Sequence, residues 1–247
     1  MTGGLELRGL DVAFGLRPAV RTLDLAVAAG ESVALVGANG AGKTTTLLAL
    51  AGALKSGARI VGTQHFAGRA FPWGDVRGRL AAGISLVPER EKVFTLLTVR
   101  ENLRIGASRA RGDRVRLDDV LSWFPRLGER RETLAGNLSG GEQQMLALGV
   151  SLLGTPRLIL LDEPTLGLAV PVIEDFCASL RRLKAELGLG ALVAESDSNW
   201  LPHLADRAVV IDRGRRVADF ARLEPPDLDA IHDVMLGLTN SGEVGHG

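Results

Sequence analysis

The sequence predicts an α/β fold with a mainly parallel central sheet that is covered by helices. One observation is a set of continuous apolar runs, typical of strands buried on both faces of a parallel sheet. These runs lie at 33–36, 158–161, 191–194 and 208–211. The other observation is that segments of helical periodicity lie between the runs. These segments are 44–54, 115–124, 142–153 and 172–187.

We expect a single domain over residues 1–247, a length within reach of one large α/β domain. Alternating apolar residues at Leu5–Leu7 and Leu23–Val27 indicate half-exposed strands, so an antiparallel β portion should open the chain. A last helix is expected at 228–238, after two prolines. The expected parts are the core at 1–88 and 154–224, a helical insertion at 89–153 without a clear buried strand, and a C-terminal helix and tail at 225–247.

Composition narrows the class of protein. Hydrophobic residues make up 46% of the chain, and the formal charge of +0 provides no overall attraction to nucleic acid, so no nucleic-acid partner is expected. The single cysteine excludes an internal disulfide and a cysteine metal cage. No signal peptide and no apolar run of about 18–20 residues is seen, so we expect a soluble, cytoplasmic protein.

Residues 37–44 read GANGAGKT, a complete phosphate-binding loop between a predicted strand and a predicted helix. Its glycines let backbone N–H groups turn toward a phosphate, and the helix N-terminus adds positive partial charge. Lys43 is expected to bridge the β- and γ-phosphates of ATP, and Thr44 to bind Mg²⁺. The expected nucleotide-binding residues here are Gly37, Ala38, Asn39, Gly40, Ala41, Gly42, Lys43, Thr44 and Thr45.

The matching acidic element is LILLDEP at 158–164. It carries Asp162 and Glu163 to the end of a buried strand, where open α/β sheets bind their ligands. Asp162 is the expected magnesium-site carboxylate, acting from beyond the ion's direct ligands. Glu163 is the expected general base, because phosphoryl transfer is catalysed mainly by positioning and charge. Without the phosphate loop, such a pair would indicate only a solvated turn.

The segment LSGGEQQ at 138–144 has two interpretations. Ser139 and Glu142 have the spacing of a capping box that opens a helix. Gly140 and Gly141 are poor helix formers, and their bare N–H groups at a helix start would make an anion site. Together with the phosphate loop and LILLDEP, this segment resembles the ATP-binding cassette (ABC) family, and the resemblance covers nearly the whole chain.

The resemblance implies a P-loop ATPase cassette that binds ATP and Mg²⁺. It also implies a head-to-tail dimer, with a second cassette or with another copy of this chain, that encloses two ATP molecules. Ser139, Gly140, Gly141 and Glu142 would then bind the nucleotide held by the partner. The family stacks adenine on an aromatic residue upstream of the loop, and Phe14 occupies that place in a chain without tyrosine. A core phenylalanine is the alternative for Phe14.

Two stretches resemble the second, smaller ATPase subunit of branched-chain amino-acid importers. Residues 86–103, LVPEREKVFTLLTVRENL, resemble the loop that contacts the permease, and 165–169, TLGLA, has Ala169 where many cassettes have aspartate. That branch has glutamate in place of the glutamine that senses γ-phosphate. The resemblance therefore assigns Glu89 to catalysis and to the Mg²⁺ site. The alternative for 87–93 is an exposed charged loop whose charges are all solvated.

Ser196, in LVAESDSNW, falls where most cassettes have a histidine that contacts γ-phosphate and the catalytic water. The branch resembled here commonly has glutamine, so serine is a further departure. A serine hydroxyl can donate to a phosphate oxygen, but it carries no proton-linked charge near neutral pH. We expect a catalytic sensor role for Ser196, while repulsion should keep Glu195 and Asp197 away from γ-phosphate.

The resemblance implies an ATP-hydrolysing subunit on the inner face of the cell membrane. It would power uptake of a small solute, such as a branched-chain amino acid, an amide or urea, through separate permease subunits. A solute-binding protein outside the cytoplasm would be an indirect partner. Two alternatives stay open: an ATP-dependent dimerisation or regulatory cassette with weak hydrolysis at its own site, and a soluble ABC ATPase without a permease.

Overall fold

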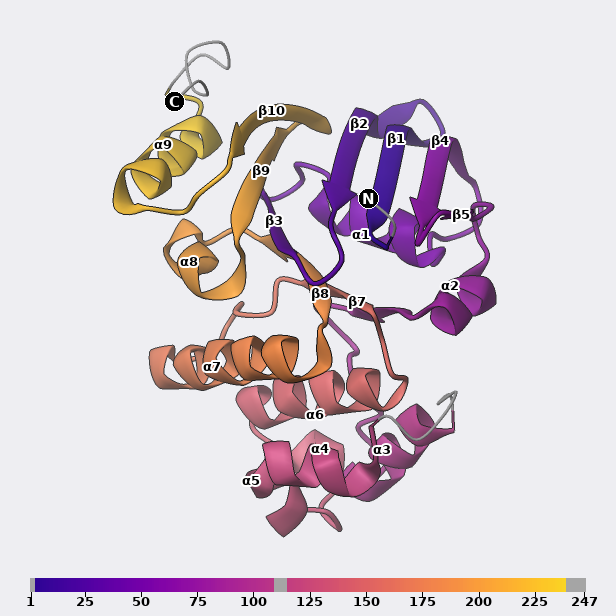
Figure 1. The fold of residues 1–247 in the computed structure, drawn as a ribbon, viewed down its shortest axis with the longest axis vertical. Coiled ribbons are helices and arrows are strands. Elements are labelled where there is room, and N and C mark those ends of the chain that lie inside the picture. The colour runs from indigo at the N-terminus through magenta and orange to yellow at the C-terminus, as the bar shows by residue number, and fades with distance from the viewer. Residues whose placement is uncertain (1–2, 109–114, 239–247) are drawn as a thin grey trace.

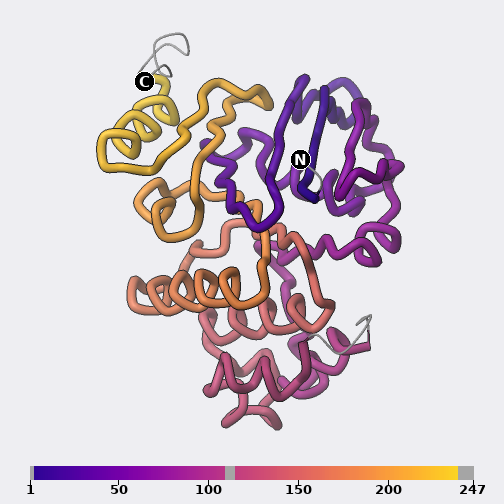
Figure 2. The backbone as a smooth tube through the Cα atoms, in the orientation of Figure 1, coloured from indigo at the N-terminus to yellow at the C-terminus, as the bar shows by residue number. Residues whose placement is uncertain are grey.

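The computed structural model describes residues 3–108 and 115–238. Two sheets lie toward one end of the molecule, and helices from the middle of the chain, drawn in magenta and pink, gather at the other (Figure 1). The backbone tube in Figure 2 follows the same path. The predicted α/β class is therefore confirmed, and the tail that was predicted beyond residue 238 lies outside the described residues.

The smaller sheet is antiparallel, as the opening of the chain predicts. Its four strands run in the order β2-β1-β4-β5. Burial alternates at the start of β1 (Leu5–Phe14), with Leu5 and Leu7 buried and Glu6 exposed, because one face packs on the core and the other faces solvent. The strands are β1 (Leu5–Phe14), β2 (Arg17–Val27), β4 (Ala58–Phe66) and β5 (Arg69–Ala70).

The larger sheet has six strands in the order β10-β9-β3-β8-β7-β6. They are β3 (Ser32–Val36), β6 (Ile84–Val87), β7 (Leu158–Asp162), β8 (Gly190–Glu195), β9 (Arg207–Asp212) and β10 (Arg215–Phe220). The five strands from β9 to β6 are parallel, and β10 is an antiparallel edge strand. Every residue of β3, β7 and β8 is buried, which confirms the interpretation of their apolar runs.

Helices form at all the predicted places, with shifted ends, and others were missed. They are α1 (Lys43–Ala51), α2 (Val76–Ala82), α3 (Val99–Ala107), α4 (Leu117–Trp123), α5 (Pro125–Glu129), α6 (Gly140–Leu153), α7 (Val170–Leu187), α8 (Leu201–Leu204) and α9 (Pro225–Leu236). The expected start of the last helix at residue 228 is wrong. The helix begins at Pro225, because the first helical positions need no N–H donor and favour the fixed φ of proline.

The hydrophobic core has three parts that tie the elements together. One joins α3, α4 and α6 to α7 and one face of the large sheet, and includes Leu103, Leu146 and Phe176. A second lies between the small sheet, α1 and the large sheet, and a third is covered by α9. The helical segment therefore packs directly on the sheet; its proposed limits, 89–153, remain a prediction.

Among the described residues, no helix combines the length and the apolar character that crossing a membrane requires.

Candidate active site

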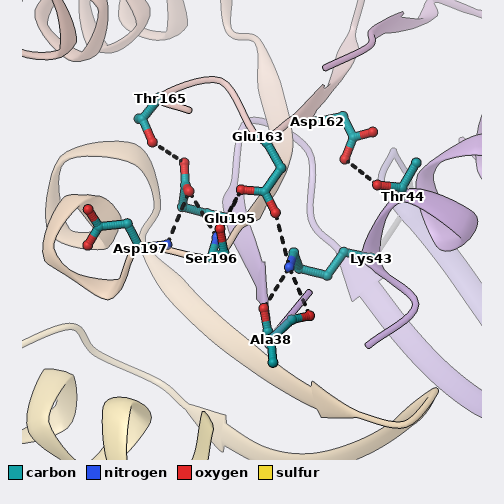
Figure 3. Close-up of polar contacts among 10 residues, drawn as sticks. Ala38, Lys43, Thr44, Asp162, Glu163, Thr165, Glu195, Ser196 and Asp197 are labelled. Atoms are coloured by element: carbon teal, nitrogen blue, oxygen red, sulfur yellow. Dashed lines mark hydrogen bonds and ion pairs between the residues drawn. The ribbon is translucent and has the colours of Figure 1, made fainter. Parts of the chain in front are cut away.

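The carboxyl ends of three neighbouring strands meet at one edge of the large sheet. Val36, the last residue of β3, pairs with Glu195 of β8, and Asp162 of β7 pairs with Ala194. The segments that follow these strands are the phosphate loop, the Asp162–Glu163 pair and the turn at Ser196. Parallel pairing thus brings together motifs that lie far apart in the sequence (Figure 3).

The phosphate loop has a backbone that only glycine allows at key points. Gly40 and Gly42 have φ values of +82° and +110°, and α1 begins directly after Gly42. A Cβ atom on Gly42 would lie 2.6 Å from the carbonyl oxygen of Ala19, and one on Gly37 would lie 2.3 Å from that of Ile211. The loop is therefore held close to its supports and has the form of a phosphate cradle that opens onto a helix N-terminus.

Lys43 lies inside this cradle, with only 5% of its surface exposed. Its ammonium donates to the carbonyl oxygens of Gly37, at 2.6 Å, and Ala38, at 3.3 Å. It also forms an ion pair with Glu163 Oε1 at 3.0 Å. The structure thus joins the lysine of the loop to the predicted general base, a contact that the spacing of the motifs does not predict.

Thr44 and Asp162 present oxygen atoms side by side. The Thr44 hydroxyl donates to Asp162 Oδ1 at 3.0 Å. Burial raises the pKa of Asp162 to about 6, and the hydrogen bond from Thr44 opposes that rise. A desolvated carboxylate beside a hydroxyl fits Mg²⁺, which prefers oxygen ligands and binds proteins through few side chains plus phosphates and waters. Groups of three or more His, Cys, Asp or Glu fit for a metal are absent from the described part of the chain.

Glu163 is held in a strained conformation that aims its carboxylate at the cradle. Its φ of +46° is unusual for a residue with a side chain and costs on the order of 1 kcal/mol. Its N–H donates to the carbonyl oxygen of Ala194 at 2.9 Å, so the neighbouring strand supports the turn. Its Oε2 accepts from the hydroxyl of Ser196 at 2.7 Å and from the Ser196 N–H at 3.2 Å.

Ser196 therefore contacts the predicted base directly. Glu195, which precedes it, was expected only to be repelled by phosphate, yet it is a buried member of the site. Its carboxylate accepts from the Thr165 hydroxyl at 2.7 Å and from the N–H groups of Ser196 and Asp197 at 2.9 and 3.2 Å. Burial raises its pKa to about 7, and these hydrogen bonds oppose the rise. Sequence reasoning missed the pairing of Glu195 with Thr165 because the two residues lie 30 positions apart.

A cleft of about 350 Å³ lies over the phosphate loop. Glu89 is on its wall, although its assigned role in catalysis and Mg²⁺ binding stays a prediction, and so is Arg90, whose Nε donates to Glu89 Oε1 at 3.0 Å. Sequence reasoning missed Arg90. Phe14 ends β1, is 43% exposed and does not line the cleft, so its stacking role stays a prediction. The lining residues are Ala19, Asn39, Gly40, Gly42, Lys43, Thr44, Thr45, Glu89, Arg90, Glu163 and Leu166.

Both interpretations of LSGGEQQ find support at the start of α6. Ser139 and Glu142 form the capping box: each side chain accepts from the other's N–H, at 3.3 and 2.9 Å. Gly141 is buried, and a Cβ there would lie 2.3 Å from Val172 Cγ1. Gly140 is exposed. None of these residues lines the cleft over the phosphate loop, so within one chain the two motifs stay apart.

The loop after β6 has one feature that corrects an expectation. The alternative of fully solvated charges over 87–93 is wrong for Lys92, which is half-buried and donates to Gln144 of α6. The apolar pair in this loop is divided, because Val93 packs on the core while Phe94 is 54% exposed. A groove of about 210 Å³ runs past this loop, with Leu80, Lys92, Phe94 and Val150 among its lining.

Fold and site together define a nucleotide-binding protein with a phosphate loop at the strand ends of a parallel sheet. A protein-family model described as ABC transporter matches residues 20–166. The high-affinity branched-chain amino acid transport ATP-binding protein BraG of Pseudomonas aeruginosa is 41% identical, over 83% of this chain and 87% of its own length. The chain belongs to the ABC transporter family and is an ATP-binding cassette ATPase.

Other relatives are more distant. The arabinose import ATP-binding protein AraG 2 of Burkholderia thailandensis and the molybdenum import ATP-binding protein ModC of Escherichia coli are both 34% identical over 94% and 82% of the chain. The chain spans 45% and 56% of the length of these two proteins. A solved nucleotide-free cassette from an ABC transporter matches with a TM-score of 0.79 at 22% identity, covering 93% of this chain and 98% of its own. This likeness confirms the predicted cassette fold.

Proposed function

We propose that this chain hydrolyses ATP to drive uptake of a small solute through a separate membrane permease, with a branched-chain amino acid as the leading cargo. The observation that carries the ATPase part is the convergence of Lys43, Glu163 and the Thr44–Asp162 pair at one edge of the sheet (Figure 3). The cargo rests on the name of the BraG relative, while arabinose and molybdenum relatives supply the competing candidates.

Different groups of the chain have different roles in the proposed hydrolysis. The backbone N–H groups of the phosphate loop and the N-terminus of α1 bind the phosphates. When ATP binds, Lys43 exchanges a carbonyl partner for phosphate oxygens. Its positive charge also reduces the repulsion between the phosphates and the Glu163 carboxylate. Glu163 accepts a hydrogen bond from the attacking water, while Ser196 fixes one carboxylate oxygen. Mg²⁺ held near Thr44 and Asp162 would neutralise phosphate charge, and Glu89 on the cleft wall would face the same phosphates.

We infer that a second cassette completes the site. Ser139 and Gly140 are exposed at the start of α6, away from the cleft of their own chain. A head-to-tail partner arrangement would bring these two exposed residues to the γ-phosphate bound by the other chain. One solved structure of similar fold, with a TM-score of 0.75 and 22% identity, is described as a dimeric post-hydrolysis state bound to ADP and Pi.

The loop after β6 is the proposed link to the permease. Glu89 and Arg90 line the nucleotide cleft, and Lys92 and Phe94 line the neighbouring groove. A partner segment seated in the groove would therefore touch the same short loop as the nucleotide. Exposed Phe94 and Leu96 are suitable apolar contacts for such a segment. In this arrangement the protein is peripheral on the inner membrane face, and a solute-binding protein delivers cargo from outside.

A regulatory cassette with weak hydrolysis is the second candidate, favoured by one observation. The Ser196 hydroxyl donates to Glu163, so the sensor position is already engaged with the base. A short serine bonded in this way reaches phosphate less readily than a histidine would.

Glu163→Gln tests the proposal in complexes reconstituted from this chain, a candidate permease and the partner cassette. Glutamine cannot accept a proton from water, so hydrolysis should fall by about a hundredfold or more while ATP binding persists. An ATP-bound dimer should accumulate, measured by size-exclusion chromatography with labelled ATP. Normal turnover by the variant would contradict Glu163 as base and favour the regulatory candidate. Transport of labelled leucine, arabinose and molybdate by the unmodified complex identifies the cargo.

A further inference from the structure

We propose that Glu195 is a positioning residue for ATP hydrolysis, which, together with Thr165, holds Ser196 against Glu163. The inference rests on the proposed role of Glu163 as the general base. Glu195 accepts a hydrogen bond from the Ser196 N–H and acts on the base through that residue (Figure 3). It also connects the base to the loop 165–169, which follows the Asp162–Glu163 pair.

Every acceptor oxygen of Glu195 is engaged. The residue ends β8 and is only 1% exposed. Its Oε2 accepts from the Thr165 hydroxyl at 2.7 Å, and its Oε1 accepts from the N–H groups of Ser196 and Asp197 at 2.9 and 3.2 Å. These bonds tie the turn after β8 to the segment after β7, because one carboxylate accepts from two N–H groups of the turn and from the Thr165 hydroxyl.

Ser196 connects the hydrogen bonds of Glu195 to the proposed base, Glu163. Its N–H is shared between Glu195 Oε1, at 2.9 Å, and Glu163 Oε2, at 3.2 Å. Its hydroxyl donates to the same Glu163 oxygen at 2.7 Å. With Lys43 on the other oxygen, the Glu163 carboxylate is fixed at both ends. Movement of the turn would therefore rotate or release the group that must orient water.

Packing alone does not account for this carboxylate. The other residues of β8 are apolar or glycine, and a buried carboxylate costs free energy unless cations or donors compensate. Within the described residues, no ion pair of 4.0 Å or less links Glu195 to a lysine, arginine or histidine. Hydroxyl and backbone donors compensate instead, and one of these donors, the Ser196 N–H, also reaches the proposed base. An apolar residue would fill the space at lower cost but would leave Ser196 unrestrained.

Thr165 also connects these hydrogen bonds to the loop that borders the nucleotide cleft. It begins the loop 165–169, whose next residue, Leu166, is 56% exposed and lines the nucleotide cleft. A shift of the loop would act on the base through Thr165, Glu195 and Ser196 in turn.

Thr165→Val and Thr165→Ser form the matched test, in the full chain assembled with its partner subunits. Valine keeps the shape and removes the donated hydrogen bond, whereas serine keeps the bond. We expect valine to lower kcat for ATP about tenfold, with little change in KM or in melting temperature, and serine to restore most of the rate. Glu195→Gln provides a second variant, since its amide preserves the shape without the charge, and should also lower kcat selectively. Thr63→Val, on the exposed face of β4, is the control and should keep the full rate.

Full kcat in Thr165→Val would overturn the inference, as would a serine variant as slow as the valine one. So would a loss of rate matched by loss of ATP binding or of melting temperature, because that pattern indicates structural support alone. If the unmodified assembly fails to hydrolyse ATP, or Glu163→Gln turns over normally, the proposed function fails and the inference with it. Normal wild-type activity with an indifferent Thr165→Val overturns only the inference.

Discussion

Lys43 and Glu163 are the pair of residues on which the rest of the site depends. Their side chains are 5% and 7% exposed, and their atoms approach to 3.0 Å. Attraction between buried opposite charges offsets their loss of hydration, but the removal of one partner leaves the other charge unpaired. The ion pair thus stabilises the site and also holds the Glu163 carboxylate beside the phosphate loop.

Lys43→Ala should lower the free energy of unfolding by about 3 kcal/mol, because it leaves the Glu163 carboxylate buried without a cation. Adding Glu163→Gln to that variant should recover part of the loss, although neither double nor single variant hydrolyses ATP. Urea denaturation without nucleotide, applied to the unmodified protein, the two single variants and the double variant, measures the coupling energy between Lys43 and Glu163. Strictly additive losses would mean that the ion pair has no weight in stability.

At the scale of elements, the start of α6 meets the start of α7. The capping box explains why the helix begins directly after Ser139, and buried Gly141 explains how closely α6 approaches α7. The capping-box spacing was recognisable in the sequence, whereas the reason for Gly141 was not, since it depends on Val172 of another helix. A second capping box, at Thr98 and Glu101, opens α3, and this signal in the sequence went unused.

Gly141→Ala should destabilise the protein by about 1–3 kcal/mol, because the new methyl group would overlap Val172 Cγ1. Gly140→Ala is the matched control for stability: its Cβ would lie 3.6 Å from Leu168, an ordinary contact, and alanine favours helix. Val172→Ala should relieve the Gly141→Ala variant. Melting temperatures of the unmodified protein, the two glycine variants and the Gly141→Ala/Val172→Ala double variant measure these effects. Equal destabilisation at both glycines would count against the proposed packing of Gly141 on Val172.

At the scale of the whole molecule, one chain holds the phosphate loop and the LSGGEQQ segment but keeps them apart. The phosphate loop lies at the strand ends, and the LSGGEQQ segment lies at the start of α6, outside the cleft. The proposed dimer joins them. This separation means that defects in the two motifs should behave as defects in different subunits.

Mixing Lys43→Ala and Ser139→Arg chains tests this separation. Each variant alone should be inactive, because arginine at residue 139 would block the N–H groups of the helix start. If two copies of this chain pair, the mixture should regain a measurable fraction of activity, since mixed dimers contain one intact site. Full activity of Ser139→Arg alone would contradict a composite site. Recovery that instead requires a different cassette would identify that cassette as the partner.

The phosphate loop, the buried strands and the main helices were predictable because their signals are local. A fixed spacing of glycines and lysine, or a run of apolar residues, has its meaning within a dozen positions. Strand β6 escaped prediction because half of its residues are only partly buried, as befits the edge of a sheet. The family resemblance then allowed the three motifs to be assigned to one kind of site.

Contacts between distant residues were decided by the tertiary structure. The Ser196 hydroxyl could have faced phosphate or protein, and strand pairing directs it to Glu163, thirty-three positions away. The sequence suggested only that Glu195 is repelled by phosphate, whereas the fold provides it with the Thr165 hydroxyl and two N–H donors. Hydrogen bonds need orientation as well as proximity, and the orientation of these groups follows from the packing of β7 against β8.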